Sequence, residues 1–136
     1  MPFLHLSLCP APGADPSLRE LAATLTNLTA EHLAKDPQLT AVHIELVPGT
    51  HWFIGARALA VDTLASYRLQ TQVTAGTNTP TQIADYLAAV HAAMGAALGR
   101  LHPTSYTVVQ QLPAEAWGYG GKSQASRRIR SDPATV

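Results

Sequence analysis

The sequence is poor in charged residues. Lysine, arginine, aspartate and glutamate make up 13% of its 136 residues, against about 25% in an ordinary soluble domain. Nine basic residues balance nine acidic ones, so no net field attracts the chain to nucleic acid and we expect no such partner. So few charges cannot cover the surface of a monomer, and the composition therefore favours a homo-oligomer.

Cysteine and clustered histidine are also scarce. The single cysteine, Cys9, cannot form an internal disulfide. The histidines show neither HxH nor HExxH spacing, so the sequence predicts no metal site and no cofactor; they stand at positions 5, 32, 43, 51, 91 and 102. The opening MPFLHLSLCPAPG has no basic segment and only a short apolar run, which is untypical of a signal peptide or membrane span. We expect a cytoplasmic protein without membrane contact.

An internal repeat organises the chain. The segment VPGTHWFIGARALA aligns without gaps on LPAEAWGYGGKSQA. The alignment brings three pairs into register: Pro48 with Pro113, Trp52 with Trp117, and Gly55 with Gly120. Conservative matches continue on both sides of this motif. We therefore expect one domain over 1–136, with one repeat at about 2–60, a second at about 67–125, and a basic tail at 122–136.

The first repeat has the pattern of a strand, a helix and a second strand. Apolar residues alternate from Leu4 to Cys9, recur at helical spacing from Leu18 to Leu33, and alternate again from Val42 to Leu46. The Asp15-Pro16 pair predicts the start of the helix. The Asp36-Pro37 pair predicts its end.

The second repeat has the same pattern. A strand at 69–73 precedes a helix that Thr79 and Gln82 open as a capping box, and a last strand follows at 106–112. Because a helical crossover makes its two strands parallel, the sequence predicts an α/β (α+β) fold. Its four-stranded mixed sheet has both helices on one face and apolar residues on the other, which a partner subunit would cover.

Two tandem β-α-β units that begin at a proline directly after Met1 resemble the tautomerase superfamily, which includes 4-oxalocrotonate tautomerase (4-OT) and macrophage migration inhibitory factor. The resemblance covers almost the whole chain. It is sharpest from Lys35 to Ile44, which is similar to migration inhibitory factor, and in the Trp-Phe-Ile-Gly of 52–55, which is similar to 4-OT. It implies a homotrimeric tautomerase that isomerises a small 2-hydroxy-dienoate or 2-keto acid.

Pro2 is the catalytic residue that this resemblance implies. Removal of Met1 would expose its secondary amine. An α-amino group has a pKa of about 7.7–8.0, and burial among apolar residues lowers that pKa by disfavouring the cation. Such an amine can act as a general base near neutral pH.

The resemblance implies substrate-binding roles for four further residues, each of which has a structural alternative. Lys35 would polarise a carbonyl or carboxylate of the substrate, although a cation near the end of a helix is also favourable against the helix dipole. Tyr106, Trp117 and Trp52 would line the pocket, with Trp117 or Tyr106 donated by a neighbouring subunit. Packing alone also explains these three aromatic side chains.

The arginines that bind carboxylates in this superfamily are missing. Their positions fall near Pro12, near Ala41 and at 74–77, where no arginine stands. Dehalogenase and decarboxylase activities are therefore disfavoured, and a non-catalytic trimeric binding or structural module remains as the second hypothesis. The tail is either a solvated end or a segment that folds over a neighbour's pocket and supplies the missing carboxylate-binding arginine; its candidates are Arg127, Arg128 and Arg130.

Overall fold

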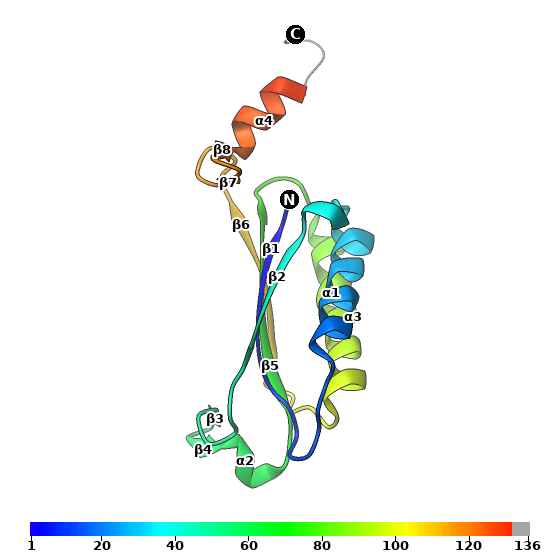
Figure 1. Cartoon of the computed structure of the whole chain (residues 1–136), viewed down its shortest axis with the longest axis vertical. Coiled ribbons are helices and arrows are strands. Elements are labelled where there is room, and N and C mark those ends of the chain that lie inside the picture. Colours follow the sequence, from blue (N-terminus) through cyan, green and yellow to red (C-terminus); the bar gives the residue numbers. More distant parts are fainter. Residues whose placement is uncertain (132–136) are drawn as a thin grey trace.

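The computed structural model describes residues 1–131, in which four strands form one sheet and two long helices pack side by side on one of its faces (Figure 1). The elements are β1 (Phe3–Cys9), β2 (Ala41–Leu46), β5 (Ser66–Thr74), β6 (Tyr106–Leu112), α1 (Leu18–Leu33) and α3 (Pro80–Leu98). The strand order is β2-β1-β5-β6. Strand β1 pairs in parallel with β2, β5 pairs in parallel with β6, and the central pair of β1 and β5 is antiparallel. The predicted fold class is confirmed.

Each repeat ends in a small hairpin and a helix. These elements are β3 (Phe53–Ile54), β4 (Arg57–Ala58) and α2 (Leu59–Asp62) in the first repeat, and β7 (Gly118–Tyr119), β8 (Lys122–Ser123) and α4 (Gln124–Ser131) in the second. The hairpin turns have positive φ at two successive residues, 55 and 56 or 120 and 121, which is the geometry of a type I′ turn. The hairpins lie at opposite ends of the sheet, and β7–β8 lies at the end where the chain begins (Figure 1).

The core lies between the sheet and the two helices. Alternation along β1 directs Leu4, Leu6 and Leu8 into it, and all three are fully buried. One polar group bridges three elements there: the Tyr86 hydroxyl of α3 lies 3.0 Å from the Thr29 hydroxyl of α1 and 2.9 Å from the Thr71 hydroxyl of β5. Since buried polar groups require partners, this network fixes both helices on the sheet. No helix within 1–131 is both long and apolar enough to cross a bilayer.

The boundaries of the first helix differ from the prediction. Helix α1 begins at Leu18, and its N-cap is Ser17, whose hydroxyl accepts a hydrogen bond from the Glu20 amide at 3.2 Å. The helix ends at Leu33 because Ala34 adopts a left-handed conformation. The Asp36-Pro37 pair instead starts a short 3-10 helix, η1 (Pro37–Leu39). The capping box at the start of α3 is present as predicted.

The face of the sheet away from the helices is more polar than expected. Phe3, Tyr106 and Val108 are exposed large hydrophobic residues of its strands. The same face also carries polar side chains from all four strands, which are His5, Ser7, His43, Glu45, Arg68, Gln70, Gln72 and Gln110. The expectation of an apolar second face therefore holds for only a few positions.

Replacing Tyr86 by phenylalanine should destabilise the fold. The substitution leaves the Thr71 hydroxyl in the core without its tyrosine partner, and an unpaired buried group of this kind costs about 1–3 kcal/mol. Chemical denaturation monitored by circular dichroism measures the change. The matched control is Tyr106→Phe, because Tyr106 is 63% exposed and its hydroxyl stands at the surface; a change of less than about 0.5 kcal/mol is expected there. Equal losses in both variants would contradict the role of the network.

Candidate active site

The amino end of the chain lies between two adjoining cavities at one end of the sheet. One cavity, of about 350 Å³, is lined by Pro2, Leu39, Trp117 and Tyr119 among others. The other, of about 570 Å³, is lined on one side by Lys35 and Thr77 and on the other by Lys122 and Arg127. Met1, Leu39 and Tyr119 line both. We call the two together the amino-terminal cleft.

Segments from both repeats build this cleft. Pro2 is buried directly before β1, and its carbonyl accepts a hydrogen bond from the Ala41 amide at the start of β2, at 3.3 Å. The turn after α1 contributes Lys35, because the left-handed Ala34 redirects the chain there. The β7–β8 hairpin of the second repeat contributes Trp117 and Tyr119. The end of the second repeat thus closes over the beginning of the first (Figure 1).

The electrostatics of the cleft favour a neutral amine. Burial lowers the pKa of the α-amino group at Met1, and the nearby positive charge of Lys35 lowers it further, while Asp36 acts in the opposite direction. Burial also lowers the pKa of Lys35, whose ammonium donates a hydrogen bond to the Thr77 hydroxyl at 2.8 Å. Among the described residues, no aspartate or glutamate lines either cavity. The cleft is therefore suited to an anion.

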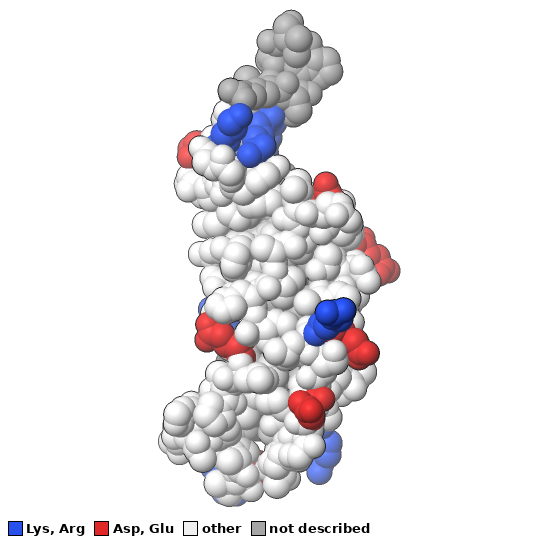
Figure 2. Space-filling model, in the orientation of Figure 1, with Lys and Arg blue, Asp and Glu red and all other residues white. Residues whose placement is uncertain are grey.

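Two arginines of the predicted tail, Arg127 and Arg128, line the larger cavity, at the end of the molecule where Lys and Arg side chains gather in Figure 2. Residues 124–131 form α4 instead of a solvated end, and Arg127 on this helix is partly buried beside a cavity of its own protomer. Its guanidinium donates a hydrogen bond to the Tyr119 carbonyl at 2.9 Å and lies 3.8 Å above the Tyr119 ring. Its Nε and the side-chain amide nitrogen of Gln124 are buried without a hydrogen-bond partner. The cavity thus has more donors than the described residues satisfy.

Known structures share this architecture, although no protein-family model and no curated protein matches the sequence. A fused 4-OT solved as a symmetric trimer is 16% identical, with 92% of this chain and 98% of that chain covered at a TM-score of 0.76. The protein Pt0534, inactivated by 2-oxo-3-pentynoate, is 14% identical with the same coverage and a TM-score of 0.77. A macrophage migration inhibitory factor homologue from Prochlorococcus marinus is 16% identical, with 89% and 97% covered at a TM-score of 0.71. The chain has the tautomerase-superfamily fold.

Within this tautomerase fold, three of the five predicted site residues come together. Pro2 and Trp117 line the smaller cavity and Lys35 lines the larger one. Trp117 belongs to the same protomer as Pro2, where its indole donates a hydrogen bond to the Thr74 hydroxyl at 3.2 Å. The expectation that a neighbour donates Trp117 is therefore not needed to explain its place beside Pro2.

Trp52 and Tyr106 stand apart from the cleft of their own protomer. Trp52 directly precedes β3, at the opposite end of the sheet (Figure 1). Tyr106 pairs with Arg68 of β5, whereas Phe3, next to Pro2, pairs with Gln72. At about 3.3 Å per residue, this register difference separates Tyr106 from the amino end by more than about 10 Å.

Sequence reasoning missed the role of Tyr119 and did not single out Arg127 from its neighbours. The Trp-x-x-Gly motif that repeats in the sequence marks each type I′ hairpin, and recognising that turn would have placed Tyr119 beside Trp117. No comparable sequence motif marks Arg127, because its position depends on the packing of α4 against the hairpin. The side chain of Arg130 lies outside the described residues, so the expectation for it is not addressed by the structure.

Neutralising the positive residue and the negative residue near the α-amino group should move the pKa of that group in opposite directions. Lys35→Gln removes a like charge, so the pKa of the α-amino group should rise. Asp36→Asn removes an opposite charge and retains a side chain that can cap η1, so the pKa should fall. Titration of the α-amino nitrogen by NMR measures both shifts. Shifts of the same sign, or none in Lys35→Gln, would contradict the proximity of these charges to the amine.

Proposed function

We propose that this protein is a keto-enol tautomerase, an isomerase, in which the Pro2 amine moves a proton on a small 2-hydroxy-dienoate or 2-keto acid. The observation that supports it is the position of the chain's amino end, in a cleft where burial and Lys35 lower the pKa of an amine. The relative Pt0534 is inactivated by 2-oxo-3-pentynoate, a 2-keto acid, which agrees with this substrate class.

The reaction requires that Met1 be removed. Proline is small enough for this processing, and its secondary amine would then stand at the buried position before β1. In its neutral form the amine takes a proton from a carbon α to the substrate's carbonyl or from the enol hydroxyl, leaving an enolate. The ammonium so formed returns the proton to a different atom of the same molecule. No atoms are gained or lost, and no cofactor or metal takes part.

Cationic side chains of the cleft would bind the substrate and stabilise its enolate. Lys35 lies on the side of the 570 Å³ cavity that it shares with Thr77, and Arg127 lies on the hairpin side. A guanidinium grips a carboxylate through two parallel hydrogen bonds, and an ammonium stabilises the negative oxygen that develops when the α-proton leaves. In this proposal Arg127 replaces the strand arginines that the sequence lacks, and Trp117 forms the apolar wall beside Pro2.

The chain would work as a homotrimer in the cytoplasm. The fused 4-OT relative forms a symmetric trimer, and within residues 1–131 of this chain β2 and β6 are the edge strands of the sheet. Pairing of these edges between protomers would cover them. Tyr106, exposed on the open face, and Trp52 would then be available to a neighbour's cleft. All of residues 1–136 would act as one domain.

A non-catalytic trimeric module on the same scaffold is the second candidate. The observation that favours it is the absence of the superfamily's strand arginines, since Pro12 and Ala41 stand near two of their positions and 74–77 contains no arginine. A chain that retains Met1 has no secondary amine. Intact-mass measurement of natively produced protein separates the two candidates, since only removal of Met1 is compatible with catalysis by Pro2.

Pro2→Ala should lower turnover of an enolised 2-keto acid by at least about 100-fold, because general-base catalysis contributes roughly 10²–10⁴-fold. Alanine also permits removal of Met1, so the variant keeps an α-amine but loses the secondary amine held in the proline ring. Ultraviolet absorbance of the enol follows the reaction, and light scattering checks that the assembly is unchanged. Full activity in the variant would refute the proposed base.

Arg127→Lys should raise KM for a carboxylate substrate by roughly 10–100-fold, since a lost charge-assisted hydrogen bond costs about 1.5–3 kcal/mol and lysine lacks the guanidinium fork. Steady-state kinetics on a keto acid measures this. Arg57→Lys is the matched control, because Arg57 occurs on the other hairpin, where it pairs with Asp62 at 2.8 Å. An unchanged KM in Arg127→Lys would exclude Arg127 from the substrate site.

A further inference from the structure

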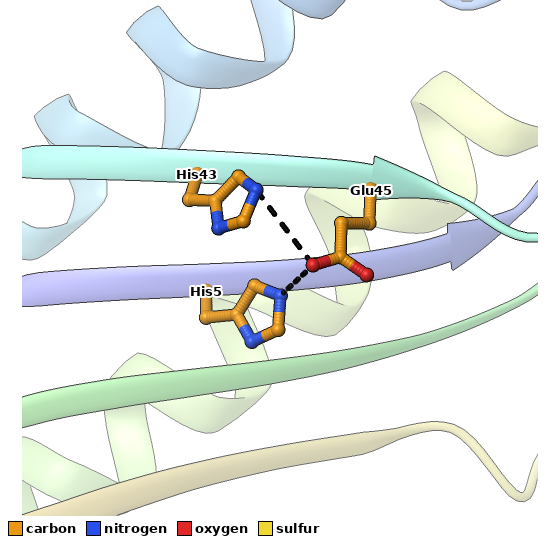
Figure 3. A group of neighbouring side chains, drawn as sticks. All are labelled: His5, His43 and Glu45. Carbon is orange, nitrogen blue, oxygen red and sulfur yellow. Dashed lines mark hydrogen bonds and ion pairs between the residues drawn. The ribbon is translucent and has the colours of Figure 1, made fainter.

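Three potential metal ligands meet on the open face of the sheet, outside the cleft. His5 stands on β1, and His43 and Glu45 stand on β2 (Figure 3). The parallel register sets His5 directly beside His43, and the two rings stack with centroids 4.9 Å apart. The Glu45 carboxylate points at both imidazoles, with its Oε1 at 3.0 Å from Nε2 of His5 and 3.7 Å from Nε2 of His43.

We propose that His5, His43 and Glu45 bind a divalent transition-metal ion, with Zn²⁺ as the best match. Two imidazole nitrogens and one carboxylate oxygen form a donor set that suits zinc, and a site with three protein ligands keeps a position for water. None of the three residues lines either cavity of the cleft. The site is therefore separate from the proposed catalytic centre, and its function does not depend on Pro2.

The separations of the donor atoms fit such an ion. With bonds of about 2.0–2.2 Å in a tetrahedral shell, ligand atoms lie about 3.3–3.5 Å from one another. The two distances to Oε1, 3.0 and 3.7 Å, bracket this value, and all three donor atoms lie within 4.8 Å of one another. The side chains of His5, His43 and Glu45 are 32%, 56% and 51% exposed, so rotation about their side-chain bonds can bring the two Nε2 atoms closer.

The surroundings of the cluster leave these ligands available. Strand alternation keeps His43 and Glu45 on the same face, and the ladder between β1 and β2 holds their backbones in place. Gln70, paired with His5 on its other side, donates its hydrogen bond to Gln110 at 2.7 Å. Among the described residues, Glu45 has ion pairs with the two histidines and none with a lysine or arginine. Arg68 of β5 stands on the same face, with Ser7 of β1 between it and Glu45, and among the described residues no ion pair joins Arg68 to Glu45.

The spacing of the histidines along the chain did not indicate this site, and the expectation of no metal site rested on that spacing alone. The ligands come from two strands joined by a helix, so their proximity depends on the register of β1 against β2. The predicted parallel pairing was correct, but the register that sets His5 against His43 is fixed only by the packed sheet. The alternation of His43 with Glu45 was the one local signal.

Cobalt and zinc binding to untagged, metal-free protein tests the proposal. Co²⁺ should bind at one ion per chain and show the intensified visible absorption of a coordination shell that is no longer octahedral and aqueous. Zn²⁺ should displace it. His43→Ala and Glu45→Gln should each weaken binding by at least about tenfold, since even changes outside the immediate ligands of a metal have effects of 10–100-fold.

His51→Gln is the matched control, because His51 is an exposed histidine in the segment that leads to β3; its binding should equal that of the parent chain. Two outcomes would overturn the proposal: absence of stoichiometric Co²⁺ binding by the parent chain, or equal affinities in the parent and in both ligand variants. The first needs no variant, so it decides the matter even if a substitution disturbs folding. Neither outcome bears on Pro2, because neither measurement involves turnover.

Discussion

The antiparallel pairing of β1 with β5 is the constraint on which the rest of the structure depends. It joins the two β-α-β repeats, whose strands run in opposite directions, in one continuous sheet. Because β6 runs parallel to β5, it runs antiparallel to β1, and its end lies where β1 begins. The hairpin after β6 therefore closes over the amino end of the chain. A short local motif in the second repeat thus forms a wall around the first residues of the protein.

The same pairing makes the two ends of the sheet equivalent in backbone but different in chemistry. Each hairpin is fixed by the same hydrogen bond, from Leu59 to the Trp52 carbonyl at one end and from Gln124 to the Trp117 carbonyl at the other. Tyr67 occupies the position in the second repeat that Pro2 occupies in the first. Its phenol is buried, burial raises its pKa, and it contacts His91. One end presents a chain terminus, and the other is filled by a core tyrosine.

Sequence pattern predicted those features that are set by local periodicity or by chain connectivity. The last strand, from Tyr106 to Leu112, has the predicted bounds, and the crossover rule gave the parallel pairs. The pattern could not rank Asp15 against Ser17 as the N-cap, since both residue types are good caps, and the structure shows that Ser17 caps the helix through the Glu20 amide. Two-residue strands are too short to show alternation, so the repeated Trp-x-x-Gly motif did not by itself predict the two hairpins. The position of Arg127 depends on the packing of α4 against the hairpin, and the periodicity of one segment does not predict contacts between segments.

The burial of Pro2 directly before β1 also limits how this chain can be handled and joined to other proteins. Residues added ahead of Met1 would have to pass between the Tyr119 hairpin and the turn that presents Leu39, because Met1 and these two residues line both cavities. An amino-terminal affinity tag or fusion partner would thus fill the cleft or push the hairpin aside. In the proposed mechanism such a chain has no free amine at Pro2, so it would fold correctly and yet show no turnover in a screen that used only tagged protein.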